Sequence, residues 1–273
     1  MTSCNVCFHK CKLNEGQIGL CKTRECKDGT IISRNYGRLS SIALDPIEKK
    51  PIARFMSGSF VLSIGSFGCN LSCPFCQNYE ISQNDDVSTR IVMPDELLDM
   101  ASELKKSHGN IGVAYTYNEP LIAHEYLRDC MELIHKAGMV NVVVSNGTVS
   151  SEIFAKLLPL IDAINIDVKG FNEDVYKRLG GDLSQVMGNV ELASRNIHLE
   201  VTSLIVPGFN DSIDDMRSQA KWLAGLSPAI PLHITRYFPR YKMQDVPATD
   251  IRLLKAMKDA ASEYLDDVML GNV

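Results

Sequence analysis

The sequence predicts an α/β protein built as a partial, open (βα)6 barrel of the TIM type. Six short apolar runs rich in β-branched residues recur along the chain, and amphipathic stretches with helical spacing lie between most of them. Apolar strands that alternate with helices indicate parallel βαβ units whose sheet is covered on both faces. Six units are too few for the eight-fold barrel. The chain also lacks a glycine-rich nucleotide-binding turn, which disfavours a doubly wound sheet.

The predicted strands and helices follow one another in a regular order. Pro94 with the acidic residues after it makes a favourable first helical turn, and Gly138 makes a favourable helix stop. Asn210 or Asp211 is expected to cap the helix that follows it. The strands are predicted at 60–67, 111–117, 141–145, 163–168, 198–206 and 231–237, and the helices at 94–107, 120–137, 150–158, 174–179, 183–194, 211–226 and 248–264.

Residues 1–56 lack this rhythm and are predicted to form a separate N-terminal segment that carries five cysteines, ahead of a barrel over residues 57–273. Charge is uneven as well: residues 1–60 hold 10 Lys and Arg against 5 Asp and Glu, whereas the remainder holds 18 against 28. A nucleic-acid partner would require denser basic patches with interleaved aromatic residues. We therefore expect no nucleic-acid partner.

Composition predicts a globular protein outside the membrane. The chain has 273 residues, 45% of them hydrophobic, which is enough to bury one large core. No apolar run approaches the roughly 20 residues that a spanning helix needs, and the N-terminus lacks a charged-then-apolar signal pattern. We expect a cytoplasmic location, where thiols stay reduced.

Three cysteines are the most informative feature of the chain. Cys69, Cys73 and Cys76 are separated by three and two residues, which offers three thiolates to a 4Fe–4S cluster and leaves one iron without a protein ligand. A three-cysteine zinc site is the alternative, but structural zinc prefers four ligands and the next cysteine is Cys130. Ligand softness and spacing favour the cluster. The open iron predicts a bound cofactor.

The run Gly68-Cys-Asn-Leu-Ser-Cys-Pro-Phe-Cys-Gln-Asn78 resembles the signature of the radical S-adenosylmethionine (radical SAM) enzymes, with Phe75 as the aromatic residue before the last cysteine. Its flanks are similar to the AmmeMemoRadiSam-type branch of the pyruvate formate-lyase activating-enzyme-like group. These flanking runs are Asp45-Pro-Ile-Glu-Lys-Lys-Pro51, Leu62-Ser-Ile-Gly65, Tyr115-Thr-Tyr-Asn-Glu-Pro120 and Pro231-Leu-His233.

The resemblance implies a partial barrel and an oxidoreductase that reductively cleaves S-adenosylmethionine to a 5′-deoxyadenosyl radical, which abstracts hydrogen from a substrate. It implies an electron donor such as flavodoxin or ferredoxin. The substrate is expected to be a glycine of a partner protein, or another protein or small molecule. A metal-binding scaffold without catalysis is the competing interpretation.

The resemblance also implies residues that contact the cofactor. Phe75 is expected to pack against the adenine ring of the cofactor. Glu119 is expected to accept hydrogen bonds from the cofactor ammonium, and His233 is expected to contact the cofactor. Glu119 could instead serve as a helix-start residue, and His233 as a satisfied core histidine. The remaining expected contacts are Ser145, Asn146, Asp167, Lys169 and Val206. Asp167 and Lys169 could form only a mutual salt bridge, and Arg236 and Tyr237 are expected at the substrate mouth.

The N-terminal segment carries a second group of thiols. Cys4, Cys7, Cys11 and Cys21 suit a structural zinc or an auxiliary iron–sulfur cluster, and a segment this short needs a staple to order it. Cys26 and His9 are spare ligands. Free thiols are the third interpretation.

Overall fold

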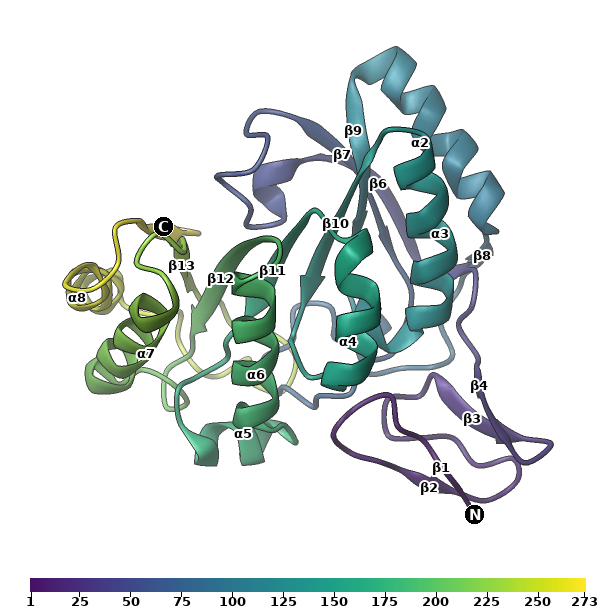
Figure 1. Cartoon of the computed structure of the whole chain (residues 1–273). Helices are drawn as coiled ribbons and strands as arrows, with labels where there is room; N and C mark the ends of the chain where they lie inside the picture. Colours follow the sequence, from purple (N-terminus) through teal and green to yellow (C-terminus); the bar gives the residue numbers. More distant parts are fainter.

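The computed structural model describes all 273 residues, and its centre is one eight-stranded sheet (Figure 1). The strand order is β14-β13-β12-β11-β10-β9-β7-β6, with β6 antiparallel to β7 and every other pair parallel. The strands are β6 (Ser41–Pro46), β7 (Phe60–Gly65), β9 (Asn110–Tyr115), β10 (Val140–Ser145), β11 (Ala163–Asp167), β12 (His198–Ile205), β13 (Leu232–Arg236) and β14 (Val268–Gly271). The two edge strands do not pair with each other, so the sheet is an open partial barrel.

The six predicted strands are confirmed, and two more extend the sheet at its edges. β6 lies inside the segment that the sequence predicts to be separate, yet it pairs with β7 over its whole length. Residues 41–46 are therefore part of the barrel sheet, and the residues before them pack against it through buried side chains such as Val6 and Leu39. β6 is short and interrupted by polar residues, so its apolar pattern is too weak to identify it without its partner strand.

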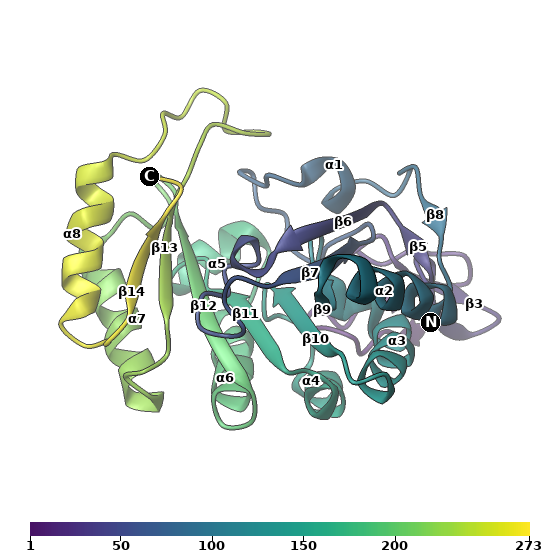
Figure 2. The ribbon, with the colours of Figure 1, turned by 90° about the horizontal axis from the view of Figure 1, so that it is seen from above.

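Helices cover the convex face of the sheet, as the view from above shows (Figure 2). Their bounds are α2 (Pro94–His108), η2 (Pro120–Ala123), α3 (His124–Lys136), α4 (Ser151–Leu157), η3 (Leu158–Leu160), α5 (Glu173–Leu179), α6 (Leu183–Ser194), α7 (Ile213–Leu226) and α8 (Ile251–Ser262), with η1 (Ile47–Lys49) and α1 (Tyr79–Ser82) elsewhere. Most predicted helices are confirmed within three residues. The cap expected at Asn210 or Asp211 is wrong: Ser212 caps α7 by accepting from the amide of Asp215 at 3.2 Å.

The loop between β6 and β7 fills one end of the barrel. Ile47 and Ile52 are fully buried there against Val61, Ala114 and Ala163. Each buried isoleucine stabilises the fold by roughly 1.5–3 kcal/mol relative to an exposed one. Val61 and Ala163 lie at the starts of their strands, so the loop fills the barrel from that end and leaves the C-terminal strand ends open.

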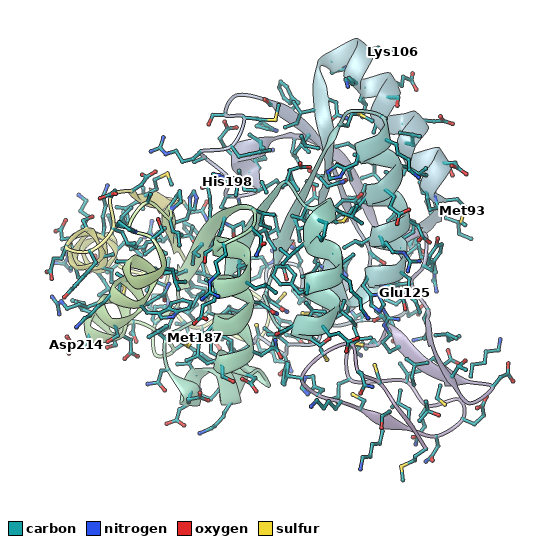
Figure 3. The ribbon with its side chains drawn as sticks, in the orientation of Figure 1. Met93, Lys106, Glu125, Met187, His198 and Asp214 are labelled. Carbon is teal, nitrogen blue, oxygen red and sulfur yellow. The ribbon has the colours of Figure 1, made fainter.

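The N-terminal segment forms small antiparallel pairs beside the helices. They are β1 (Thr2–Ser3) with β2 (Lys12–Leu13), β3 (Arg24–Lys27) with β4 (Thr30–Ser33), and β5 (Arg38–Leu39) with β8 (Arg90–Ile91). Arg24, only 1% exposed, holds the segment to α3 through a two-fold ion pair with Glu125, at 2.6 and 2.7 Å. Figure 3 shows Glu125 on the end of α3 that faces the N-terminal strands. None of the helices has the length and apolar character needed to cross a membrane.

Candidate active site

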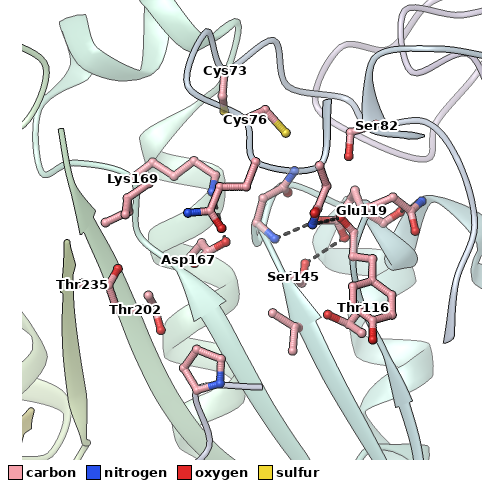
Figure 4. A pocket seen from close by; sticks show the side chains of 18 of the residues that line it. Cys73, Cys76, Ser82, Thr116, Glu119, Ser145, Asp167, Lys169, Thr202 and Thr235 are labelled. Carbon is pink, nitrogen blue, oxygen red and sulfur yellow. Dashed lines mark hydrogen bonds and ion pairs between the residues drawn. The ribbon is translucent and has the colours of Figure 1, made fainter. Parts of the chain in front are cut away.

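The C-terminal strand ends surround a cavity of about 660 Å³. Parallel strands of a barrel bring their C-terminal ends together, so side chains far apart in sequence meet there. Figure 4 shows Cys73 and Cys76 on one side of this cavity, Asp167 and Lys169 beside them, and Glu119 opposite. The other lining residues discussed below are Cys69, Phe75, Asn118, Ser145, Asn146, Thr202, Leu204 and His233.

The cysteine loop leaves β7 and is held by its neighbours. Gly68 has φ +83°, a left-handed conformation that favours glycine. The side-chain amide of Asn118 donates to the carbonyls of Phe67 and Gly68 at 3.1 and 3.0 Å, and it accepts from the amide of Ser66. These contacts aim Cys69 into the cavity. Asn118 was not predicted as a site residue, because its partners are 50 residues away in sequence.

The three cysteines are held as protonated thiols, so a metal that binds them must displace their protons. Burial raises the pKa of Cys73 to about 11 and raises the pKa values of Cys69 and Cys76 as well. Opposing groups are in place: the amide of Leu71 donates to the Cys69 sulfur at 3.4 Å, and Lys169 lowers the pKa of Cys73 and Cys76. Oriented donors and a nearby cation are what a thiolate-bound iron–sulfur cluster requires.

These residues fit a cluster better than a single metal ion. No three of the His, Cys, Asp and Glu side chains converge on a point that one ion could occupy. Four thiolates around zinc at about 2.3 Å lie about 3.8 Å apart, whereas an iron–sulfur cube spaces its ligands more widely. Only three cysteines line the cavity, so the donor set suits a cluster with one iron facing the open space.

Glu119 is a buried carboxylate at the end of β9. Its Oε1 accepts from Ser145 Oγ at 2.8 Å and from the Leu121 amide at 3.1 Å, and its Oε2 accepts from the Asn146 amide at 2.7 Å. Burial raises its pKa to about 7 against these three donors. Glu119 therefore does serve as a helix-start residue, because it accepts from the Leu121 amide. One lone pair of its Oε2 remains available to a donor in the cavity.

Asn146 links this carboxylate to the cysteine loop. Its side-chain nitrogen donates to the Cys69 sulfur at 3.6 Å and to Asn70 Oδ1 at 3.1 Å. Ser145 and Asn146 thus both lie at the cavity as predicted, with their polar atoms directed toward Glu119 and the loop.

Three neighbouring strands place a polar row across the cavity wall. Asp167 on β11 lies in register with Thr202 on β12, and Thr202 with His233 on β13. Asp167 forms the expected ion pair with Lys169 at 3.0 Å. Burial opposes the charge of Lys169, but Asp167 and the Cys73 thiolate outweigh it and raise the Lys169 pKa. The buried hydroxyl of Thr202 has no partner in the protein, so it is available to a bound group.

His233 faces the cavity while its Nε2 pairs with Glu200 Oε2 at 2.6 Å. Glu200 is fully buried and also accepts from His198 and from the amides of Ala53 and Arg54. Glu200 was not predicted from the sequence as a residue of the site. The only indication in the sequence is that a charged residue lies within the apolar strand predicted at 198–206.

Three other expectations differ from the structure. Phe75 lies at the cavity, but Val206 is fully buried behind it and does not line the cavity. The turn closed by Asn210, which accepts from the Val206 amide at 2.7 Å, turns Val206 inward, and Leu204 takes its place. Arg236 and Tyr237 are not at the mouth: Arg236 donates to the Thr249 carbonyl and Tyr237 is buried.

Comparison with known proteins identifies the family. Residues 63–222 match the model described as the Radical SAM superfamily, which is more than half of the chain. "Uncharacterized protein MJ0808" of Methanocaldococcus jannaschii is 38% identical over 276 residues, 99% of this chain and 81% of that protein. The 4-hydroxyphenylacetate decarboxylase activating enzyme of Clostridioides difficile is 27% identical over 111 residues, 39% of this chain and 35% of that enzyme.

A solved structure supports the fold. The crystal structure of a domain of pyruvate-formate lyase-activating enzyme from Bacteroides vulgatus has a TM-score of 0.52 and 16% identity, covering 59% of this chain and 99% of that domain. At this identity the likeness concerns the fold alone, and the fold agrees with the site geometry described above. The chain therefore belongs to the radical SAM superfamily.

Proposed function

We propose that the chain is a radical SAM enzyme that uses the cavity at the C-terminal strand ends to bind S-adenosylmethionine beside a 4Fe–4S cluster. The observation that carries the proposal is the trio Cys69, Cys73 and Cys76 on one loop facing a cavity of about 660 Å³ that no fourth cysteine enters. When bound, the cluster and S-adenosylmethionine supply one-electron cleavage of a sulfonium C–S bond, which leaves methionine and a 5′-deoxyadenosyl radical that abstracts hydrogen from substrate.

The protein's own residues position and shield this chemistry. The three thiols hold the cluster, and Asn146 and the Leu71 amide donate to the Cys69 sulfur. The free lone pair of Glu119 Oε2 suits the cofactor ammonium, a charge-assisted contact worth about 1.5–3 kcal/mol. Across the cavity, Lys169 suits a carboxylate.

The Thr202 hydroxyl and His233 complete the polar wall opposite the loop. Thr202 has no partner in the protein, and Glu200 fixes the His233 ring. These two side chains suit the ribose and the polar edge of the nucleoside. Phe75, buried against Phe209 with ring centroids 5.3 Å apart, supplies a rigid apolar face for the adenine.

The substrate we propose is a C–H bond of a partner protein, with a glycine as the first candidate. The support is that one similar enzyme is named as the activating enzyme of a decarboxylase. Another protein or a small molecule is the second candidate. Flavodoxin or ferredoxin is the proposed electron donor. We propose a cytoplasmic location because all nine cysteines are free, and thiols stay reduced in that compartment.

The experiment is anaerobic reconstitution with iron and sulfide, followed by reduction with dithionite in the presence of S-adenosylmethionine. Wild-type protein is expected to release 5′-deoxyadenosine, measured by chromatography, and Cys73→Ala is expected to abolish the release. Cys130→Ala is the control, since Cys130 is buried in α3 away from the cavity. A reconstituted protein that binds iron but releases no 5′-deoxyadenosine would instead indicate a metal-binding scaffold.

The substrate is tested separately. Incubation with deuterium-labelled extract is expected to transfer deuterium into 5′-deoxyadenosine, and fractionation of the extract shows whether the source is a protein. A glycyl electron-spin signal on a candidate partner would establish the glycine. Deuterium transfer from the small-molecule fraction alone would refute the protein substrate.

A further inference from the structure

The N-terminal segment gathers four thiols into one small volume outside the cavity. Cys4, Cys7 and Cys21 are 5–7% exposed, and Cys11 is half-buried. A Cβ placed on Gly19 would lie 3.7 Å from the Cys11 sulfur, and the Gly19 carbonyl accepts from the amide of Lys22 at 2.9 Å. Cys11 therefore packs against the turn that carries Cys21. The Cys4 amide also donates to the Cys11 carbonyl at 2.8 Å, which draws the two ends of this loop together.

The sulfurs in this group receive donors in the same pattern as those of the cavity. The sulfurs of Cys4 and Cys7 each accept from the backbone amide of the residue two positions further along the chain. The sulfurs of Cys69 and Cys76 accept from backbone amides at the same spacing. Thr23 Oγ1 lies 3.3 Å from the Cys21 sulfur, again two residues later. Donors aimed at a sulfur stabilise a thiolate, and ligands of iron–sulfur clusters are tuned in this way. Each of these sulfurs therefore has a polar neighbour of the kind found around cluster ligands.

The spare ligands lie outside this group. The His9 ring nitrogen Nε2 pairs with the Asn70 carbonyl at 2.8 Å, and Cys26 lies on the β3–β4 hairpin, in register with Ile31. Four thiols remain, and no three of them converge on the position of a single ion. A single zinc ion, which needs its four ligands gathered about one point, is therefore disfavoured, whereas the irons of a cube hold their thiolates further apart.

From these observations we propose that Cys4, Cys7, Cys11 and Cys21 bind a second iron–sulfur cluster, closed by four thiolates and separate from the one held by Cys69, Cys73 and Cys76. The segment around it has only two-residue strands and one hairpin. A cluster bound by these four cysteines would cross-link positions 4 to 21, where there is little regular secondary structure. The proposal does not depend on the radical chemistry, because it concerns a site outside the cavity.

The two sites share one hydrogen-bond network. The Asn70 side chain interacts with the Cys7 sulfur and accepts from Asn146, whose nitrogen also reaches the Cys69 sulfur. A Cβ at Gly68 would lie 2.4 Å from the Cys21 carbonyl, so the segment packs directly on the loop that holds the first cluster. The second cluster therefore buttresses that loop, and its loss should loosen residues 1–40 first.

The test measures iron and sulfide per chain in variants that each lack the cysteines of one of the two clusters. After anaerobic reconstitution, wild-type protein should hold about eight irons and eight sulfides per chain, from two four-iron clusters. The triple variant Cys69→Ala, Cys73→Ala and Cys76→Ala should hold about four, and the double variant Cys4→Ala and Cys7→Ala should also hold about four. Cys130→Ala is the matched control and should keep about eight.

Several outcomes would overturn the proposal. A triple variant that is folded by circular dichroism but retains no iron would do so, as would one zinc per chain that iron and sulfide do not replace. The double variant Cys69→Ala and Cys73→Ala provides the same measurement if the triple variant fails to fold. Because the triple variant lacks the cavity thiols, its iron count is independent of whether 5′-deoxyadenosine is ever released.

Discussion

Glu200 is predicted to hold together the histidine at the cavity and the loop that closes the barrel. Its carboxylate is fully buried and accepts from Ala53, Arg54, His198 and His233. Burial opposes the charge, but the two histidines and the two amides outweigh it and lower its pKa from 4.5 to about 2. At about 1.36 kcal/mol per pH unit, this difference corresponds to about 3 kcal/mol of stability.

Glu200→Gln removes this contribution and places an amide donor against other donors. We expect the free energy of unfolding in urea at pH 7 to fall by about 3 kcal/mol, and Tm to fall by roughly 6–12 °C. A depressed carboxylate pKa stabilises the protein above pH 4.5 and loses that effect as the pH falls toward 2, with about 2 kcal/mol lost by pH 3. The gap between wild type and variant should therefore shrink to about 1 kcal/mol at pH 3.

The control is Glu132→Gln, an exposed position on α3 that should change stability by less than about 0.5 kcal/mol. Two results would refute the reasoning: a Glu200→Gln variant within 1 kcal/mol of wild type at pH 7, or a gap between the two proteins that stays constant from pH 7 to pH 3.

The other predictions concern packing. Gly112→Ala should lower the free energy of unfolding by at least about 3 kcal/mol or prevent folding, because the new Cβ would lie 1.9 Å from the Val140 carbonyl oxygen. Gly188 on α6 is the matched position, since a Cβ there meets no other atom. Gly188→Ala should raise the free energy of unfolding in urea by about 0.5–1 kcal/mol. Equal effects of the two substitutions would contradict the sheet register. Glu125→Ala should cost about 3–5 kcal/mol, because it leaves the buried Arg24 guanidinium without its ion partner. Limited proteolysis should then cut residues 1–40 faster, and an unchanged cleavage rate would argue against this anchor.

The fold could be predicted from local patterns because the central parallel strands, such as β9 to β12, are buried on both faces. The runs at 141–145 and 163–168 contain mostly apolar residues, and the helices between such runs begin and end at residues such as Pro94 and Gly138. β6 was missed because an edge strand of six residues with polar ends has no such signal.

The three cysteines of the loop could be identified from local spacing alone, since three thiolates on one short loop need nothing more to meet. The polar residues at the strand ends could also be identified, because parallel topology brings those ends together. The contacts that these residues make depend instead on the folded arrangement. Glu200 reaches Ala53 across 147 residues, and Asn146 reaches the Cys69 sulfur across 77. Such pairings depend on strand register and loop packing, and a linear pattern carries no information about either until the chain has closed around its core.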